Sequence, residues 1–175
     1  MVIVITGVMA AGKSTVAQRL AERLPRAAHV RGDAFRRMIV TGRAEPAPGF
    51  STEQRRQLEL RYRLSAQVAD GYAAAGFTAV VQDIILGTDL PAYAKMVLTR
   101  PCHLVVLAPR AEVLAARDAR RGKTGYRGGW TVPAMLAELD ETPRIGLWLD
   151  NSDLTVEQTV DRILAYVTSP AGRTP

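Results

Sequence analysis

The hydrophobic residues of this chain follow two alternating patterns. Short apolar runs such as Val2 to Ile5 have the length and the β-branched composition of buried strands. Longer segments between them repeat apolar residues every three or four positions, as amphipathic helices do, and the first of these runs from Ser14 to Leu24. Because strands alternate regularly with helices, we expect an α/β fold with a doubly wound, five-stranded parallel sheet.

The remaining elements can be placed by the same patterns. Further strands are expected at residues 27–30, 77–83, 103–107 and 145–150. Further helices are expected at residues 35–40, 51–75, 89–98, 111–119, 131–139 and 156–167. Ser51 with Gln54, and Thr155 with Gln158, have the spacing of a capping box. No linker or repeat divides the chain, so we predict one domain over residues 1–168 and a disordered tail over residues 169–175.

One motif stands between the first strand and the first helix. Residues Gly7 to Ser14 read GVMAAGKS and fit the pattern G-x-x-x-x-G-K-[ST] without a mismatch. The glycines allow backbone N–H groups to turn inward on a phosphate, Lys13 can reach the β- and γ-phosphates, and Ser14 suits a Mg²⁺ ion. A glycine-rich turn with a solvated lysine is the alternative, but the flanking strand and helix favour a phosphate-binding loop.

The motif predicts most of a nucleotide site. The residues that we expect to bind nucleotide are Gly7, Val8, Met9, Ala10, Ala11, Gly12, Lys13, Ser14, Thr15, Arg117 and Arg120. Lys13 is also expected to act in catalysis. Ser14 and Asp83 are the expected Mg²⁺ ligands.

Two carboxylates follow the ends of expected strands, where open α/β sheets place their ligands. Asp33 is predicted to be the base that accepts a hydroxyl proton, with the N-cap of the next helix as the alternative. Asp83 has the place of the acidic residue that orients Mg²⁺. Ile84 follows it where an ATP-driven motor usually has a glutamate, and the chain has no Asn-Lys-x-Asp motif. Hydrolysis as the main activity and a GTPase switch are therefore disfavoured.

A basic segment follows the helix expected at residues 111–119. Residues 117–123 contain four basic side chains and lead into the glycine-rich residues 124–130. This composition predicts an arginine lid at about residues 117–130, with Arg117 and Arg121 on one face to stabilise the transferring phosphoryl group. A solvated basic helix end is the alternative.

The overall composition narrows the partners. The chain carries 23 Lys+Arg and 17 Asp+Glu, a formal charge of +6, which suits an anionic ligand such as a nucleotide or a nucleic acid. No apolar run is long enough to span a membrane. The N-terminal run leads directly into the phosphate-binding loop and does not resemble a signal peptide. With Cys102 as the one cysteine, we expect a cytoplasmic protein, as a monomer or homodimer.

These motifs together resemble the small phosphate-loop kinases, and most closely the chloramphenicol phosphotransferases. The resemblance is carried by Gly7 to Ser14, Gly32-Asp33, the stretch from Val81 to Gly87, and Arg117 to Lys123. It implies ATP- and Mg²⁺-dependent phosphorylation of a hydroxyl on a small molecule, with Asp33 as the base and the arginine segment as the lid.

The acceptor is less determined than the reaction. We expect a small, largely apolar molecule between Asp33 and a cover formed by residues 41–50 and the following helix, with Phe50, Leu58 and Tyr62. That helix carries Arg55, Arg56, Arg61 and Arg63, which are expected on a solvated face, with a place at the border of the acceptor site as the alternative. The Arg-x-Asp segment and the Arg-x-x-x-Arg-Gly segment also resemble polynucleotide 5′-kinases, which keeps a nucleic acid acceptor as an alternative. A nucleotide-binding regulatory module without transfer is the second alternative.

Overall fold

The expected parallel sheet is present. The computed structural model describes residues 1–45, 47, 49–120 and 129–169. Within these residues five strands form one sheet in the order β2-β3-β1-β4-β5, and every neighbouring pair is parallel. The strands are β1 (Val2–Gly7), β2 (Ala27–Arg31), β3 (Thr78–Gln82), β4 (Cys102–Leu107) and β5 (Leu147–Leu149).

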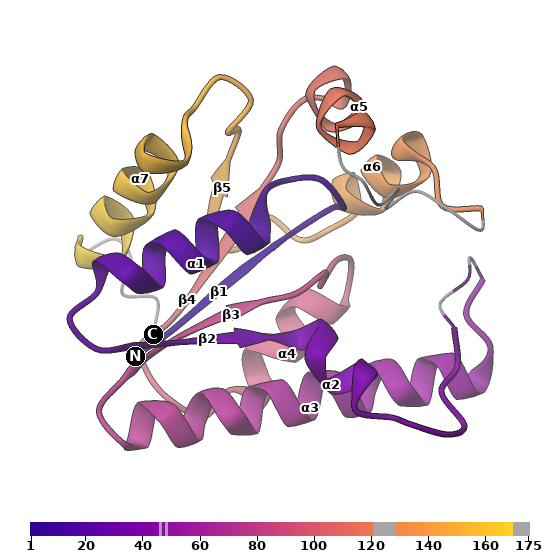
Figure 1. The fold of residues 1–175 in the computed structure, drawn as a ribbon, viewed down its shortest axis with the longest axis horizontal. Helices are drawn as coiled ribbons and strands as arrows, with labels where there is room; N and C mark the ends of the chain where they lie inside the picture. Colours follow the sequence, from indigo (N-terminus) through magenta and orange to yellow (C-terminus); the bar gives the residue numbers. More distant parts are fainter. Residues whose placement is uncertain (46, 48, 121–128, 170–175) are drawn as a thin grey trace.

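Helices connect the strands and cover both faces of the sheet. The described helices are α1 (Lys13–Arg23), α2 (Gly32–Arg37), α3 (Thr52–Ala74), α4 (Asp89–Met96), α5 (Ala111–Ala119), α6 (Val132–Asp140) and α7 (Val156–Thr168). Figure 1 shows α1 and α7 on one face of the sheet and α3 and α4 on the other. The predicted doubly wound α/β fold is therefore confirmed.

The sheet is apolar on both faces because helices cover both. All six residues of β1 are buried, and β1 pairs along its length with β4, from Val2 with Cys102 to Gly7 with Leu107. Cys102, at the start of β4, is partly buried, and burial raises the pKa of its thiol to about 11. None of the described helices is both long and apolar enough to cross a membrane.

Two predicted helix starts are confirmed by their hydrogen bonds. At α3 the Ser51 hydroxyl accepts from the Gln54 backbone, and the Gln54 side chain accepts from the Ser51 backbone. Thr155 and Gln158 make the same reciprocal pair at the start of α7. Each box satisfies two backbone donors that would otherwise lack partners at a helix start.

The largest differences from the expected element boundaries are in α2 and β5. The short helix expected at residues 35–40 is α2, which begins earlier, at Gly32, and ends at Arg37. The last strand is shorter than residues 145–150, because Gly146 turns with φ +75° and lies so close to Leu104 O that a Cβ there would overlap it. The described residues between α2 and α3 contain neither helix nor strand. They border the carboxyl edge of the sheet (Figure 1).

Candidate active site

The residues from Gly7 to Lys13 form a tight loop between β1 and α1. Gly7 (φ +138°) lies against the neighbouring strand, where a Cβ would overlap Leu107 O, and Gly12 has φ +94°. Ala10 has a positive φ as well, at +62°. Lys13 is 6% exposed and donates from Nζ to Val8 O at 2.7 Å, so its ammonium group lies within the loop.

The loop leaves the N-terminus of α1 open. Neither a side-chain cap nor an acidic residue in the first turn occupies this end of the helix among the described residues. Its backbone N–H groups and helix dipole can therefore bind an anion. Ser14 and Thr15 are exposed there, and Ser14 Oγ donates to Gln82 Oε1 at 3.2 Å.

Two polar side chains hydrogen-bond to the backbone of the phosphate-binding loop at Ala11. Buried Asn151 donates from Nδ2 to Ala11 O at 3.1 Å. Arg117 donates to Asn151 O at 2.9 Å and to Ala11 O at 3.4 Å. The structure thus places Arg117 against the loop, and its role in binding nucleotide stays a prediction. Arg120 is exposed at the C-cap of α5, while Arg121 and most of the predicted lid at residues 117–130 lie outside the described residues.

Asp33 lies in the first turn of α2. The N-cap of this helix is Arg31, so Asp33 does not have the N-cap position that was its alternative. Its carboxylate pairs with Arg37 at 2.8 Å and with Arg36 at 3.4 Å, and its side chain is 47% exposed. It is therefore open to solvent beside the phosphate-binding loop, which shares a cavity with it.

Asp83, expected beside Mg²⁺, is buried in an ion pair. Its side chain is 2% exposed, and both carboxylate oxygens accept from Arg61, with Nε at 2.7 Å from Oδ2. The Ile84 backbone also donates to Oδ1 at 2.7 Å. Gly32 lies against this carboxylate, since a Cβ there would overlap Asp83 Oδ2. The metal role of Asp83 stays a prediction, and in this geometry it requires displacement of Arg61.

The basic residues of α3 differ in their surroundings. Arg56 and Arg63 are exposed, as expected for a solvated face. The expectation was wrong for Arg61, which is only 13% exposed in its ion pair with Asp83. Burial lowers the pKa of Arg61, although a guanidinium stays protonated at neutral pH. Arg55 pairs with Asp89 and Glu59.

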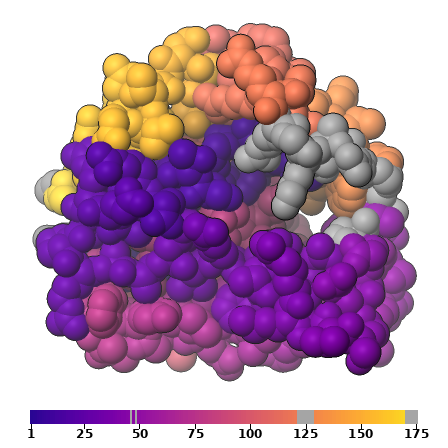
Figure 2. Space-filling view, viewed as in Figure 1, coloured from indigo at the N-terminus to yellow at the C-terminus, as the bar shows by residue number. Residues whose placement is uncertain are grey.

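A cavity of about 750 Å³ joins these groups. One wall is the phosphate-binding loop and the end of β3, another is α2 and the start of α3, and a third is α6 with the residues before it. Figure 2 shows the surface hollowed between the orange of α6 and the purple of the chain before α3. The cavity-lining residues that carry the argument below are Lys13, Ser14, Asp33, Arg36, Glu45, Phe50, Arg55, Leu58, Arg61, Tyr62, Gln82, Asp83, Leu86, Asp89, Trp130, Met135 and Glu138.

Aromatic side chains also line the cavity. Phe50, before α3, and Trp130, before α6, contact edge to face with centroids 5.9 Å apart. Tyr62 donates from its hydroxyl to Ile84 O at 2.7 Å, and burial raises its pKa. The structure thus brings Asp33, Phe50 and Tyr62 to one cavity, as expected from the sequence.

Several residues that line the cavity or contact the phosphate-binding loop could not be assigned from the sequence. Gln82 directly precedes Asp83, whose carboxylate was the expected metal ligand. Asn151 was expected only as part of a turn. Glu138 is a polar residue on an amphipathic helix, a pattern that normally indicates a solvated face. Trp130 was expected only as the end of the lid.

Comparison with known protein families identifies the family of this chain. A family described as an AAA domain matches residues 2–141, which include the phosphate-binding loop, Asp33, Asp83 and Arg117. The chain belongs to this AAA domain family. It is a phosphate-loop kinase family, which confirms the resemblance to small phosphate-loop kinases.

Solved structures share the fold of this AAA domain over nearly its whole length. A sugar kinase from Janibacter sp. HTCC2649 aligns over 99% of this chain and 98% of the kinase chain, with 21% identity and a TM-score of 0.71. The tunicamycin resistance protein of Deinococcus radiodurans covers 95% of both chains, with 21% identity and a TM-score of 0.67. Shikimate kinase from Bacteroides thetaiotaomicron covers 97% of this chain and 99% of its own, with 14% identity and a TM-score of 0.64. The search of curated proteins found no match to this chain.

Proposed function

We propose that this protein is a phosphotransferase that moves the γ-phosphate of ATP, with Mg²⁺, to a hydroxyl group of a small molecule. One observation carries the proposal. An open carboxylate, Asp33, and a phosphate-binding loop with its lysine face the same cavity. The cavity volume of about 750 Å³ suits a small molecule next to the terminal phosphate. Kinases among the solved structures of this fold support the same class of reaction.

The nucleotide phosphates would lie on the loop from Gly7 to Ser14. The uncapped N–H groups of α1 would donate to phosphate oxygens, and Lys13 would exchange Val8 O for a β- or γ-phosphate oxygen. Arg117 and Arg120 are proposed to border the nucleotide, because Arg117 already contacts Ala11 O. Arg121 keeps its proposed role at the transferring phosphoryl group but lies outside the described residues.

The oxygen donors beside the loop fit a Mg²⁺ ion that keeps several of its waters. Ser14 Oγ and Gln82 Oε1 lie 3.2 Å apart and would hold the ion or its waters. Asp83, the residue after Gln82, would join them only if Arg61 were displaced. The bound ion would neutralise charge on the phosphate oxygens.

Asp33 would do the proton chemistry. Its carboxylate accepts the proton of the acceptor hydroxyl as that oxygen bonds to the γ-phosphorus. The bond from the γ-phosphorus to the bridging oxygen breaks, and ADP keeps that electron pair. Lys13 and Arg117 stabilise the negative charge that spreads over the phosphoryl oxygens during transfer. Arg36 and Arg37 hold the Asp33 carboxylate in place.

A polynucleotide acceptor has less support. The charge of +6 suits a nucleic acid, but a polyanion needs cations that are free to bind its phosphates. Arg36, Arg55 and Arg61, which line the cavity, each already pair with a carboxylate. A regulatory module that only binds nucleotide would leave the open carboxylate of Asp33 without a use.

Two substitutions test the proposal. Asp33→Asn is expected to lower kcat by about 10²- to 10⁴-fold with ATP affinity nearly unchanged, because it removes the base and not a phosphate contact. Lys13→Ala is expected to abolish transfer. Because it also removes the hydrogen bond to Val8 O, it should lower the free energy of unfolding of the nucleotide-free protein by about 1 kcal/mol and leave the protein folded. The measurements are phosphorylated product by ³¹P NMR across a panel of hydroxyl compounds, and ATP affinity by calorimetry.

The matched control is Asp161→Asn, which removes an exposed carboxylate that pairs with Arg23. This pair joins α7 to α1 and does not line the cavity. It should leave turnover unchanged. Full turnover in Asp33→Asn would rule out the proton-accepting role. ATP binding without a phosphorylated product from any acceptor would rule out the transferase and leave the regulatory module.

A further inference from the structure

The arginines that line the cavity are already neutralised by carboxylates. Arg36 pairs with Glu45 at 3.0 Å, in addition to Asp33. Arg55 makes two hydrogen bonds to Asp89, and Arg61 makes two to Asp83. An anionic acceptor would have to break one of these pairs and leave a carboxylate without its partner, which is costly where the pair is buried.

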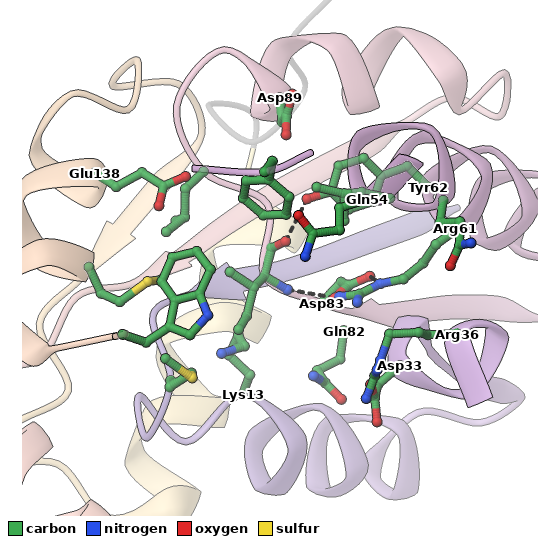
Figure 3. Close-up of a pocket in the computed structure, with 18 of the residues that line it drawn as sticks. Lys13, Asp33, Arg36, Gln54, Arg61, Tyr62, Gln82, Asp83, Asp89 and Glu138 are labelled. Carbon is green, nitrogen blue, oxygen red and sulfur yellow. Dashed lines mark hydrogen bonds and ion pairs between the residues drawn. The ribbon is translucent and has the colours of Figure 1, made fainter. Parts of the chain in front are cut away.

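Glu138 is the exception among the carboxylates that line the cavity. It projects from α6 toward the cavity, and the described residues offer it neither an ion pair nor a side-chain hydrogen bond (Figure 3). Partial burial raises the pKa of its carboxyl, and the negative charges of Asp89 and Glu141 raise it further. Among the described residues Glu138 thus presents an unpaired negative charge to the cavity, and a positive group bound there would pair with it.

Aromatic and apolar side chains line the same cavity as Glu138. Phe50 and Trp130 contact each other edge to face, and Leu86 and Met135 are buried in the same lining. A carboxylate beside aromatic rings is a favourable environment for an ammonium group, since the ring faces carry negative potential. The apolar side chains would contact the carbon skeleton of a ligand.

We propose that the acceptor is an amino alcohol with an apolar or aromatic body, whose ammonium group binds Glu138 while its hydroxyl lies at Asp33. This inference rests on the proposed function and adds the chemical class of the acceptor. Figure 3 shows Glu138 and Asp33 on opposite sides of the cavity, with Lys13 between them in that view. Two anchoring points on opposite sides fix the direction in which the hydroxyl faces the phosphate-binding loop.

Three probes of matched shape test the charge preference. Phenylalaninol is cationic, N-acetylphenylalaninol is neutral and phenyllactate is anionic, and each has one phenyl ring and one hydroxyl. Binding is measured by calorimetry with ADP and Mg²⁺ present. Phenylalaninol is expected to bind about tenfold more tightly than N-acetylphenylalaninol, and phenyllactate more weakly than either.

The variant Glu138→Gln removes the charge and keeps the size of the side chain. It should lower the affinity for phenylalaninol by about tenfold and change the affinity for N-acetylphenylalaninol by less than about twofold. Glu141→Gln is the matched control, because Glu141 carries the same charge near the end of α6 but does not line the cavity. It should leave the preference for the cationic probe in place.

Each other outcome has a defined meaning. Equal or tighter binding of phenyllactate, no binding of phenylalaninol at millimolar concentration, or an unchanged preference in Glu138→Gln would overturn the proposed acceptor class. Phosphoryl transfer from ATP to the bound probes is followed in parallel by ³¹P NMR. Transfer to an anionic acceptor alone would contradict the acceptor class and leave the transferase intact. Charge-selective binding without transfer to any probe would contradict the transferase and leave the charge recognition at Glu138 intact.

Discussion

Arg61 and Asp83 form an ion pair from which water is nearly excluded, at the junction of α3 with the end of β3. The two charges satisfy each other, and the Ile84 N–H satisfies Asp83 further. Such a pair is costly to break from one side, since the remaining charge stays buried without a partner. It also holds the Asp83 carboxylate against Gly32, which begins the helix that carries Asp33.

We therefore expect Arg61→Met to lower the free energy of unfolding by about 3 to 5 kcal/mol, measured by urea denaturation. The double variant Arg61→Met/Asp83→Asn should recover part of this loss, because it no longer leaves an isolated carboxylate. Arg63→Met, at an exposed position of the same helix, is the control and should stay within about 0.5 kcal/mol of the original protein. A double variant as unstable as the sum of the single losses would contradict the pairing.

At the scale of elements, α3 and α7 both begin with a capping box, but only α3 lines the cavity. The first turns of α3 carry Gln54, Arg55 and Leu58 into the cavity, whereas α7 packs beside α1 on the other face of the sheet. A change at the start of α3 should therefore affect both stability and the acceptor, while the same change in α7 should affect stability alone.

The test is a pair of cap substitutions. Ser51→Ala and Thr155→Ala should each lower the free energy of unfolding by about 1 kcal/mol, since each removes one cap bond. Ser51→Ala alone is expected to raise the KM for the acceptor, because the first turn of α3 would fray. Calorimetry and steady-state kinetics measure the two effects. An equal rise of KM in Thr155→Ala would show that the effect is global and not local to α3.

At the scale of the whole molecule, one histidine couples folding to pH. His29 lies half-buried on β2, with Nδ1 2.9 Å from Gln18 Oε1 and with Arg31 nearby. Burial, and then the charge of Arg31, lowers its pKa from 6.5 to about 4. Between these values the unfolded chain binds a proton that the folded chain does not, so the free energy of unfolding falls as the pH falls.

We expect urea midpoints to decrease from pH 7 to pH 4 in the original protein, and to decrease less in His29→Gln, which has no titratable group at this position. The two proteins should differ in slope only between about pH 6.5 and pH 4. Identical slopes would show that the pKa of His29 is the same in the folded and the unfolded chain, which would contradict the lowered value.

How far the sequence predicts this molecule depends on the range of the interactions involved. Local patterns suffice for strands such as Val2–Gly7, for both capping boxes and for the phosphate-binding loop, because the determining residues are neighbours in the chain. The ion pair of Arg61 with Asp83 joins residues 22 positions apart, and nothing in the helical pattern of α3 distinguishes Arg61 from Arg63. Likewise, the side chain of Asn151 reaches a carbonyl 140 positions away. Such contacts form only when the folded chain brings distant residues together, so no local sequence pattern predicts them.

One buried hydroxyl joins the two halves of the candidate site. Thr6, the last residue of β1 before Gly7, accepts from Ile85 N and donates to Ile85 O, both at 2.8 Å. The strand that leads into the phosphate-binding loop is thereby fastened to the segment after β3, which supplies Asp83, Ile84 and Leu86 to the cavity. The chain before α3 and the cavity-lining residues of α6 are not part of this connection. For protein engineering, selectivity for the acceptor can thus be changed on those two walls while the floor that positions phosphate against hydroxyl is kept.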